Sequence, residues 1–322
     1  MTRARIVGTG SYLPERIMKN SEFEERLETT DLWIQERTGI KERRIAAPDQ
    51  GTCDLAEHAA RAALEASNWD ASDLDLIIVG TTTPDRIYPS TACRLQARLG
   101  VGGCAAFDVQ AVCTGFVYAL GIAENFIRAG TAKRALVVGA DTHSRLLDWN
   151  DRGTCILFGD GAGAVTVEAA DEPGIYSTHL HADGSYESLL YVEGGTPRGA
   201  GQISEGDAYT HMRGNEVFKV AVRTLMSIAE QTLQANGMDK SQVDWLIPHQ
   251  ANMRIIEATA RKLGMDNDRV VVTVDRHGNT SAASVPLAFD TAVRDGRIKR
   301  GDVLLLEAFG GGFTWGSALV RF

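Results

Sequence analysis

A single cysteine, Cys113, stands where a strand-like segment of the sequence gives way to a helix-like one. Segment 104–109 is short and apolar enough for a buried strand, and apolar residues recur at helical spacing over 113–127. A thiol at the start of a helix meets unpaired N–H groups and the positive end of the helix dipole, which both favour the thiolate. The sequence therefore predicts a nucleophile at Cys113 and a covalent acyl intermediate on its sulfur.

Two further polar residues follow strand-like segments later in the chain. His249 comes directly after the apolar segment 243–247, and Asn279 lies between a predicted strand at 270–274 and a helix expected from about Ser281. A cysteine can attack a thioester, while a histidine and an asparagine can donate hydrogen bonds to a developing oxyanion or enolate. A lone histidine is more often a capping or core residue, but three polar residues at strand-to-helix turns favour a catalytic role.

These elements belong to a pattern that the chain repeats about 166 residues later. Segment 72–78 resembles 241–247, and segment 126–130 resembles 292–296. Alternating helices and strands indicate an α/β fold of two similar halves, residues 1–172 with the cysteine and residues 173–322 with the histidine and the asparagine. An offset of 166 places Cys113 opposite Asn279 across a pseudo-twofold axis. Chance similarity between generic α/β units is the alternative.

The remaining cysteines and glycine-rich segments predict structure more than chemistry. The other four cysteines have apolar neighbours and are expected to be small core residues: Cys53, Cys93, Cys104 and Cys155. Segment 158–164 lacks both the GxGxxG spacing and a Walker lysine, so we expect a backbone-packing turn there. Segment 309–313 is either a tight strand connection or a turn that aims an N–H at an oxyanion. We expect His277 to shape the loop around Asn279.

Composition limits the class of protein. The 322 residues are 44% hydrophobic, which is enough for a large core, and the net charge of −9 argues against nucleic acid as the main partner. The five cysteines form no CxxC pair, and the chain begins like a strand and not like an export signal, so a cytoplasmic location is expected. The sequence has no Cys/His cluster with the spacing of metal ligands, so no metal site is expected. It has no apolar run of membrane-spanning length, so membrane insertion is not expected either.

Several segments together resemble the thiolase-fold condensing enzymes, most closely the β-ketoacyl-acyl-carrier-protein synthase III family. The resembling segments run over nearly the whole chain: 111–116, 151–154, 158–163, 212–218, 248–252, 277–282 and 307–312. The resemblance implies a five-layered αβαβα fold of two duplicated halves and a homodimer. It also implies a catalytic triad of Cys113, His249 and Asn279, and an oxyanion hole made by the backbone N–H groups of Cys113 and Gly311.

The resemblance further implies that acetyl-CoA and malonyl-acyl carrier protein condense with loss of carbon dioxide, which starts type II fatty acid synthesis. CoA is then part of a substrate, and no cofactor is expected. The implied CoA contacts are Trp33, Arg37, Arg152, Gly214, Phe218 and Asn252. The implied acyl-pocket residues are Tyr88, Leu157, Phe158 and Phe309. The implied docking residues for the acidic carrier protein are Lys219, Arg254, Arg261 and Lys262.

Three alternatives stay open on the sequence alone. Tyr88 stands where relatives often carry a phenylalanine that closes the acyl pocket of the partner subunit. The first alternative is therefore a condensing enzyme that uses a longer or branched primer or acts in secondary metabolism. A non-catalytic homologue that only binds carrier protein is the second, although Cys113, His249 and Asn279 are all present. A nucleotide-binding dehydrogenase is the third, and the chain lacks the dinucleotide fingerprint for it.

Overall fold

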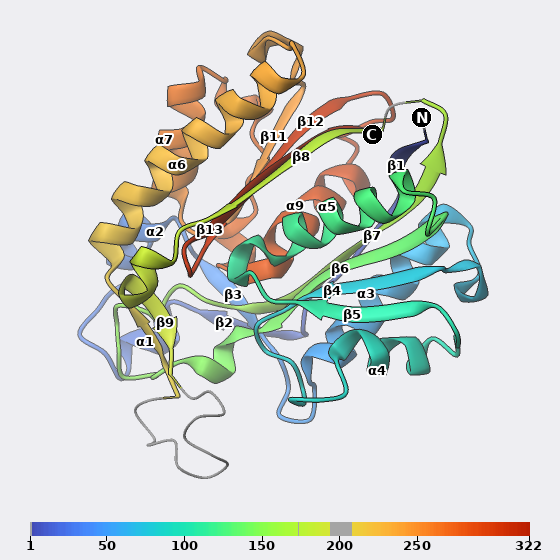
Figure 1. Cartoon of the computed structure of the whole chain (residues 1–322). Helices are drawn as coiled ribbons and strands as arrows, with labels where there is room; N and C mark the ends of the chain where they lie inside the picture. The colour runs from blue at the N-terminus through green and yellow to red at the C-terminus, as the bar shows by residue number, and fades with distance from the viewer. Residues whose placement is uncertain (1, 173, 194–207) are drawn as a thin grey trace.

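Two twisted β-sheets form the frame of the molecule, which we describe from a computed structural model covering residues 2–172, 174–193 and 208–322 (Figure 1). The first sheet has the strand order β1-β7-β6-β4-β5. Its strands are β1 (Arg3–Tyr12), β7 (Asp160–Ala170), β6 (Arg134–Thr142), β4 (Leu76–Gly80) and β5 (Ala105–Val109). The second sheet has the order β11-β12-β13-β8. Its strands are β11 (Trp245–Pro248), β12 (Val303–Gly310), β13 (Thr314–Arg321) and β8 (Ile175–Ala182).

Helices fill three layers around the two sheets. Helices α5 (Gly115–Arg128) and α9 (Ser284–Arg294) lie between the sheets and share one apolar core with both of them. Helices α3 (Thr52–Ser67) and α4 (Thr91–Arg98) cover the outer face of the first sheet. Helices α6 (Gly214–Ala235) and α7 (Met253–Leu263) cover the outer face of the second. The αβαβα layering expected from the resemblance is thereby confirmed.

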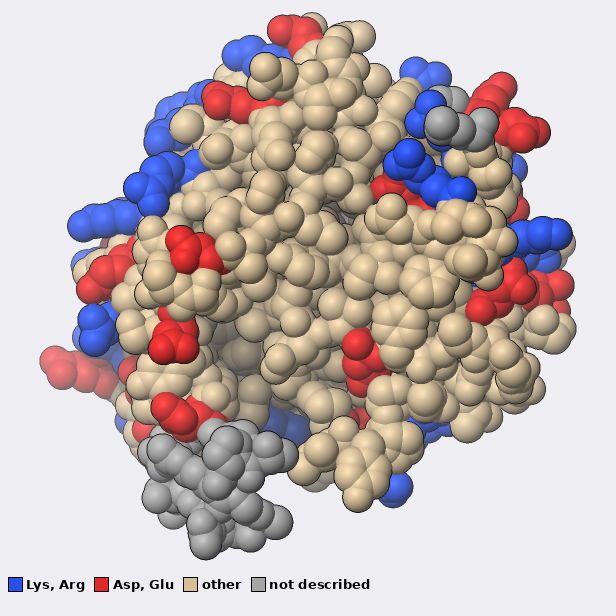
Figure 2. Space-filling view, viewed as in Figure 1, with Lys and Arg blue, Asp and Glu red and all other residues tan. Residues whose placement is uncertain are grey.

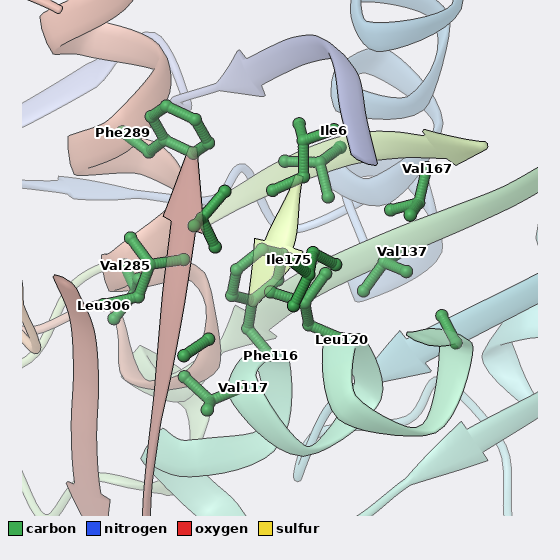
Figure 3. Packing of buried hydrophobic residues seen from close by; sticks show 14 of the residues in the cluster. Ile6, Phe116, Val117, Leu120, Val137, Val167, Ile175, Val285, Phe289 and Leu306 are labelled. Atoms are coloured by element: carbon green, nitrogen blue, oxygen red, sulfur yellow. The ribbon is translucent and has the colours of Figure 1, made fainter. Parts of the chain in front are cut away.

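Strand β4 explains why both faces of a sheet must be covered. Leu76 and Ile78 point into the central core, whereas Ile77 and Val79 point toward α3 and α4. Successive strand residues alternate between faces, and a strand buried on both faces is therefore apolar throughout. Figure 3 shows the central core, where Phe116 and Leu120 of α5 lie near Val137 of the first sheet.

The glycine-rich segment 158–164 is mostly strand, and the predicted turn is wrong. Residues from Asp160 onward belong to β7, which pairs with β1 and β6 inside the first sheet. A Cβ on Gly163 would lie 2.7 Å from the backbone of Leu287 in α9. The glycine is needed because it lets the central helix approach the sheet, which the sequence pattern alone did not reveal.

The two halves share one topology, in a register that differs from the predicted one. The order β1-β7-β6-β4-β5 corresponds to β8-β13-β12-β11, and the counterpart of β5 is reduced to a bridge between Leu246 and Val270. Short 3-10 turns precede both central helices and begin at Val112 and Ser281, which are 169 residues apart. Helix α5 has 14 residues and α9 has 11, so the offset falls to 166 only beyond these helices. Cys113 therefore corresponds to Ala282 and not to Asn279.

Smaller elements complete the chain. They are β2 (Arg16–Lys19), α1 (Ser21–Glu24), α2 (Asp31–Thr38), β3 (Glu42–Ile45), β9 (Leu190–Val192), β10 (Thr210–Met212) and α8 (Val274–His277). The predicted strand at 270–274 is wrong, since only Val270 makes a bridge and a helical turn starts at Val274. Residue 173, where the second half was predicted to begin, lies outside the described residues.

Candidate active site

Cys113 lies in a strained turn at the entrance of α5. The preceding Val112 has a φ of +49°, in the left-handed region that β-branched residues rarely adopt. The turn presses against the end of β12, because a Cβ on Gly310 would lie 2.7 Å from the Cys113 nitrogen. Strain of this kind persists only where the surroundings enforce it, and here the surroundings fix the direction of the sulfur.

The resting state of the thiol differs from the prediction. The pKa of Cys113 is raised to about 12, mainly by burial; the Ser281 hydroxyl acts to lower the pKa, and the charge of Asp141 adds to the rise. Cys113 is only 5% exposed, and desolvation penalises a thiolate strongly. The helix start therefore does not produce a resting thiolate, and the thiol must give up its proton as it attacks.

His249 is held as a neutral imidazole whose Nδ1 is bonded to Ser284. Burial lowers its pKa to about 3, and its Nδ1 lies 2.5 Å from the Ser284 Oγ. The same Oγ accepts the Gln250 N–H at 3.1 Å, so the buried hydroxyl has its own proton left to donate to Nδ1. With the hydroxyl donating to Nδ1, the imidazole proton sits on Nε2, and His249 is then a hydrogen-bond donor through that nitrogen.

Asn279 is oriented as a second donor. Its Oδ1 accepts the Ser281 N–H at 2.9 Å, which leaves the side-chain NH2 available. Its backbone forms a bridge with Phe158, through bonds to Leu157 at 2.8 Å and to Gly159 at 2.9 Å. The amide is therefore anchored from both its side chain and its backbone.

Asp141, at the end of β6, ties the two halves together beside the thiol. Its Oδ1 accepts hydrogen bonds from Thr81, Thr82 and Thr83 at 2.8 to 3.2 Å, and its Oδ2 accepts the Ala282 N–H at 3.1 Å. The aspartate is fully buried. It fixes the turn after β4 against the turn before α9, and so sets the loop of Asn279 relative to Cys113.

These side chains meet in one cavity of about 300 Å³. Cys113, His249 and Asn279 all line it, although they come from three separate segments. Predicted substrate residues that also line it are Trp33, Arg37, Arg152, Leu157, Phe158, Gly214, Phe218, Asn252, Arg254 and Phe309. Most of the other lining residues are apolar, which favours a ligand with a hydrophobic arm.

At one side of this cavity two arginines gather around one tryptophan. The guanidinium of Arg152 lies 4.6 Å and that of Arg37 lies 5.4 Å from the centre of the Trp33 ring. Asn252 caps α7 through the Arg254 N–H at 2.8 Å, and its NH2 donates to the Arg37 carbonyl at 3.1 Å. This group offers a flat aromatic face with two cations, which suits a phosphorylated nucleotide.

Other predicted residues lie outside the cavity. Tyr88 is 83% exposed in the loop between β4 and α4, and it does not line the catalytic cavity of its own chain. Gly311 is buried and follows Gly310, which lines the cavity. Three docking candidates are exposed on the outer helices: Lys219, Arg261 and Lys262. Lys and Arg side chains gather along the edge of the molecule over α6 and α7 in Figure 2.

Sequence reasoning missed Ser284 and Asp141. Ser284 lies at the start of α9, after the loop of Asn279, and Asp141 lies at the end of β6. A polar residue at the end of a buried apolar strand was the available signal for Asp141. Within residues 2–172, 174–193 and 208–322, no group of His, Cys, Asp or Glu could hold a metal ion. In the same ranges, no helix is both long and apolar enough to cross a bilayer.

Known proteins match this chain over its whole length. Family models for 3-oxoacyl-[acyl-carrier-protein] synthase III match residues 107–184, and for its C-terminal part residues 233–322. The β-ketoacyl-[acyl-carrier-protein] synthases III of Thioalkalivibrio sulfidiphilus and Alkalilimnicola ehrlichii are 66% and 62% identical to it, with 100% of both chains covered. The crystal structure of 3-oxoacyl-[acyl-carrier-protein] synthase III from Aquifex aeolicus superposes with a TM-score of 0.93 at 45% identity, again over 100% of both chains.

Proposed function

The chain belongs to the 3-oxoacyl-[acyl-carrier-protein] synthase III family, and we propose that it starts fatty acid synthesis from acetyl-CoA. It is a condensing enzyme that joins an acyl group from CoA to a malonyl group on acyl carrier protein. The observation that carries the proposal is the convergence of Cys113, His249 and Asn279 in one cavity beside the Trp33 group.

In the first step, the Cys113 sulfur attacks the thioester carbonyl of the acyl-CoA. The carbonyl electrons form an oxyanion, for which we propose the backbone N–H groups of Cys113 and Gly311 as donors. The C–S bond to CoA then breaks, and the thiol proton leaves with the CoA sulfur. Because the pKa of the buried thiol is raised, the sulfur gives up its proton only in the course of the attack.

In the second step, malonyl-acyl carrier protein loses carbon dioxide and becomes an enolate. His249 Nε2 and the Asn279 NH2 donate hydrogen bonds to the thioester oxygen that carries the charge. The enolate carbon attacks the acyl carbon on Cys113, and the thiolate leaves and recovers a proton from solvent. Removing one such donor costs on the order of a hundredfold in rate.

Mass-tagged acetyl-CoA tests this assignment by peptide mapping. We expect the label on the peptide with Cys113, loss of labelling in Cys113→Ser, and unchanged labelling in the control Cys93→Ser. Asn279→Ala should still be acylated but should not condense. Label on another peptide would refute the mechanism, and an unlabelled wild-type enzyme would favour a non-catalytic carrier-binding homologue.

We propose that the carrier protein docks on the basic outer face of α6 and α7. Arg254, Arg261 and Lys262 are exposed there, and none forms an ion pair within the described part of the chain. Exposed charges set association rates and salt dependence more than intrinsic chemistry. Arg261→Glu should lower kcat/KM for malonyl-acyl carrier protein about fivefold at low salt, with acylation by acetyl-CoA unchanged. Equal loss of both activities would contradict docking at this face.

We further propose a cytoplasmic homodimer in which Tyr88 closes the partner's acyl pocket. Ile87 and Tyr88 are 85% and 83% exposed, which is unusual for two adjacent large apolar side chains. Light scattering of the wild type and of Ile87→Asp tests the assembly. The wild type should have twice the mass of one chain, and Ile87→Asp should shift toward the single-chain mass. A monomeric wild type would overturn this part of the proposal.

A further inference from the structure

The side chain of Gln250 ends in an amide that makes four hydrogen bonds inside the protein. Its Nε2 donates to the carbonyl oxygens of Pro248 at 2.7 Å and Val271 at 3.0 Å. Its Oε1 accepts the backbone N–H groups of Thr273 at 2.8 Å and Val274 at 3.1 Å. An amide has two donor hydrogens and an oxygen with two lone pairs, so every bonding position of this fully buried side chain is used.

Helix α8 receives its first bonds from this amide. The side chain of Thr273, the residue before α8, makes no capping bond, and Gln250 caps the helix from the neighbouring loop instead. The helical turn carries the constraint onward, because the Gly278 N–H donates to the Val274 carbonyl at 3.0 Å. Asn279 is the next residue, so the amide of Gln250 fixes where the chain leaves α8 toward it.

His249 has anchors of its own that do not involve this amide. Its backbone N–H donates to the Glu307 carbonyl at 2.8 Å, and its Nδ1 lies 2.5 Å from the Ser284 hydroxyl oxygen. The amide of Gln250 therefore acts on the other donor: it joins the segment before Asn279 to the end of β11, which His249 directly follows.

We propose that Gln250 is a positioning residue that sets the distance between the two donors of the second step, His249 Nε2 and the Asn279 NH2. The inference rests on the proposed function, since it concerns the enolate oxygen to which both donors bond. Two fixed donors stabilise one oxygen only where their spacing matches its position. Attack of Cys113 on the acyl-CoA uses neither donor, so the effect of Gln250 falls on the step that releases carbon dioxide.

Gln250→Met tests this inference, because methionine has a similar length and makes none of the four bonds. On the acetylated enzyme, release of carbon dioxide from malonyl-acyl carrier protein should slow about tenfold. Mass-tagged acetyl-CoA should still label Cys113 at the wild-type rate. The loss is smaller than the roughly hundredfold loss of a removed donor, since the Asn279 amide is displaced and still present. A folded Gln250→Met with the wild-type rate of carbon dioxide release would overturn the inference, and so would equal slowing of both steps.

A double variant separates positioning from a general loss of structure. Asn279→Ala removes the donor through which Gln250 acts. Adding Gln250→Met should therefore not slow the residual carbon dioxide release of Asn279→Ala any further, because the two changes remove the same interaction. A further loss of the same size as in the single variant would contradict action through Asn279.

Gln96→Met is the matched control. Gln96 Nε2 also donates to a backbone carbonyl, that of Cys104 at 2.7 Å, but Gln96 does not line the catalytic cavity, so both rates should stay at their wild-type values. If Gln250→Met does not fold, Gln250→Glu replaces it: the carboxyl group loses at least one of the two donated bonds and should show the same selective slowing. If acetyl label never reaches Cys113 in the wild type, the proposed function fails. If it does and the folded Gln250 variants release carbon dioxide normally, only the role of Gln250 fails.

Discussion

Replacing Asp141 with asparagine should weaken the fold and yet make Cys113 more reactive. The carboxylate accepts the Ala282 N–H with one oxygen and bonds from residues 81–83 with the other. Whichever way an amide is turned, its NH2 meets a buried backbone N–H, either that of Ala282 or those of Thr82 and Thr83. Each unsatisfied group costs about 1 to 3 kcal/mol, so we expect the free energy of unfolding to fall by about 2 to 4 kcal/mol.

The reactivity of the thiol should change in the opposite sense. The charge of Asp141 is one of the causes that raise the pKa of Cys113, so removing the charge lowers that pKa. Each lowering of the pKa by one unit raises the thiolate fraction about tenfold at a fixed pH below it. Iodoacetamide should then alkylate Cys113 faster in Asp141→Asn than in the wild type at every pH between 7 and about 10.

Asp160→Asn is the matched control for this pair of effects. Asp160 is also a buried carboxylate that accepts backbone N–H groups, from Ala46 at 2.7 Å and Ser144 at 2.8 Å. It is not among the charges that act on the pKa of Cys113. Denaturant unfolding should show a loss of stability in both variants, and peptide mapping should show faster alkylation only in Asp141→Asn. Equal alkylation rates in a folded Asp141→Asn and the wild type would refute the electrostatic argument.

Three further predictions concern the neighbours of the triad. Ser284→Ala removes the hydroxyl that bonds to His249 Nδ1 and should slow condensation about tenfold. Acylation of Cys113 by acetyl-CoA should stay at its wild-type rate. Slowing of both steps would contradict the argument that Ser284 sets the tautomer of His249. Burial raises the pKa of Glu307 to about 8, so between pH 4.5 and 8 the unfolded chain releases a proton that the folded chain keeps, and stability falls as pH rises. Denaturant titrations should therefore show that Glu307→Gln exceeds the wild type in free energy of unfolding by more at pH 8 than at pH 5. An equal difference at both pH values would contradict a protonated Glu307 in the folded chain. Gly310→Ala places a Cβ 2.7 Å from the Cys113 nitrogen and should abolish acylation by acetyl-CoA, whereas Gly102→Ala, with open space around its Cβ, should retain it.

Sequence reasoning found the layers and the three polar residues because both leave local signals. Apolar strands alternate with helical periodicity, and Cys113 and His249 each lie shortly after a strand-like segment. The register of the repeat was wrong by three residues, since α9 is shorter than α5 and no local pattern reports helix length relative to a distant copy. The pKa of Cys113 was misjudged because burial depends on residues far away in the sequence, such as Gly310 and Asp141.

The backbone bridge between Phe158 and Asn279 connects the wall of the catalytic cavity to a donor that the condensation step needs. Phe158 lines the catalytic cavity and supports the His143 ring, and the same strand segment holds the amide of Asn279 through two backbone bonds. An oversized acyl group that pushes Phe158 aside also displaces the Asn279 donor from the enolate oxygen. Such a primer would load onto Cys113 and then stall before the carbon–carbon bond forms. One piece of chain therefore links the fit of the primer to the condensation step, without a second active site.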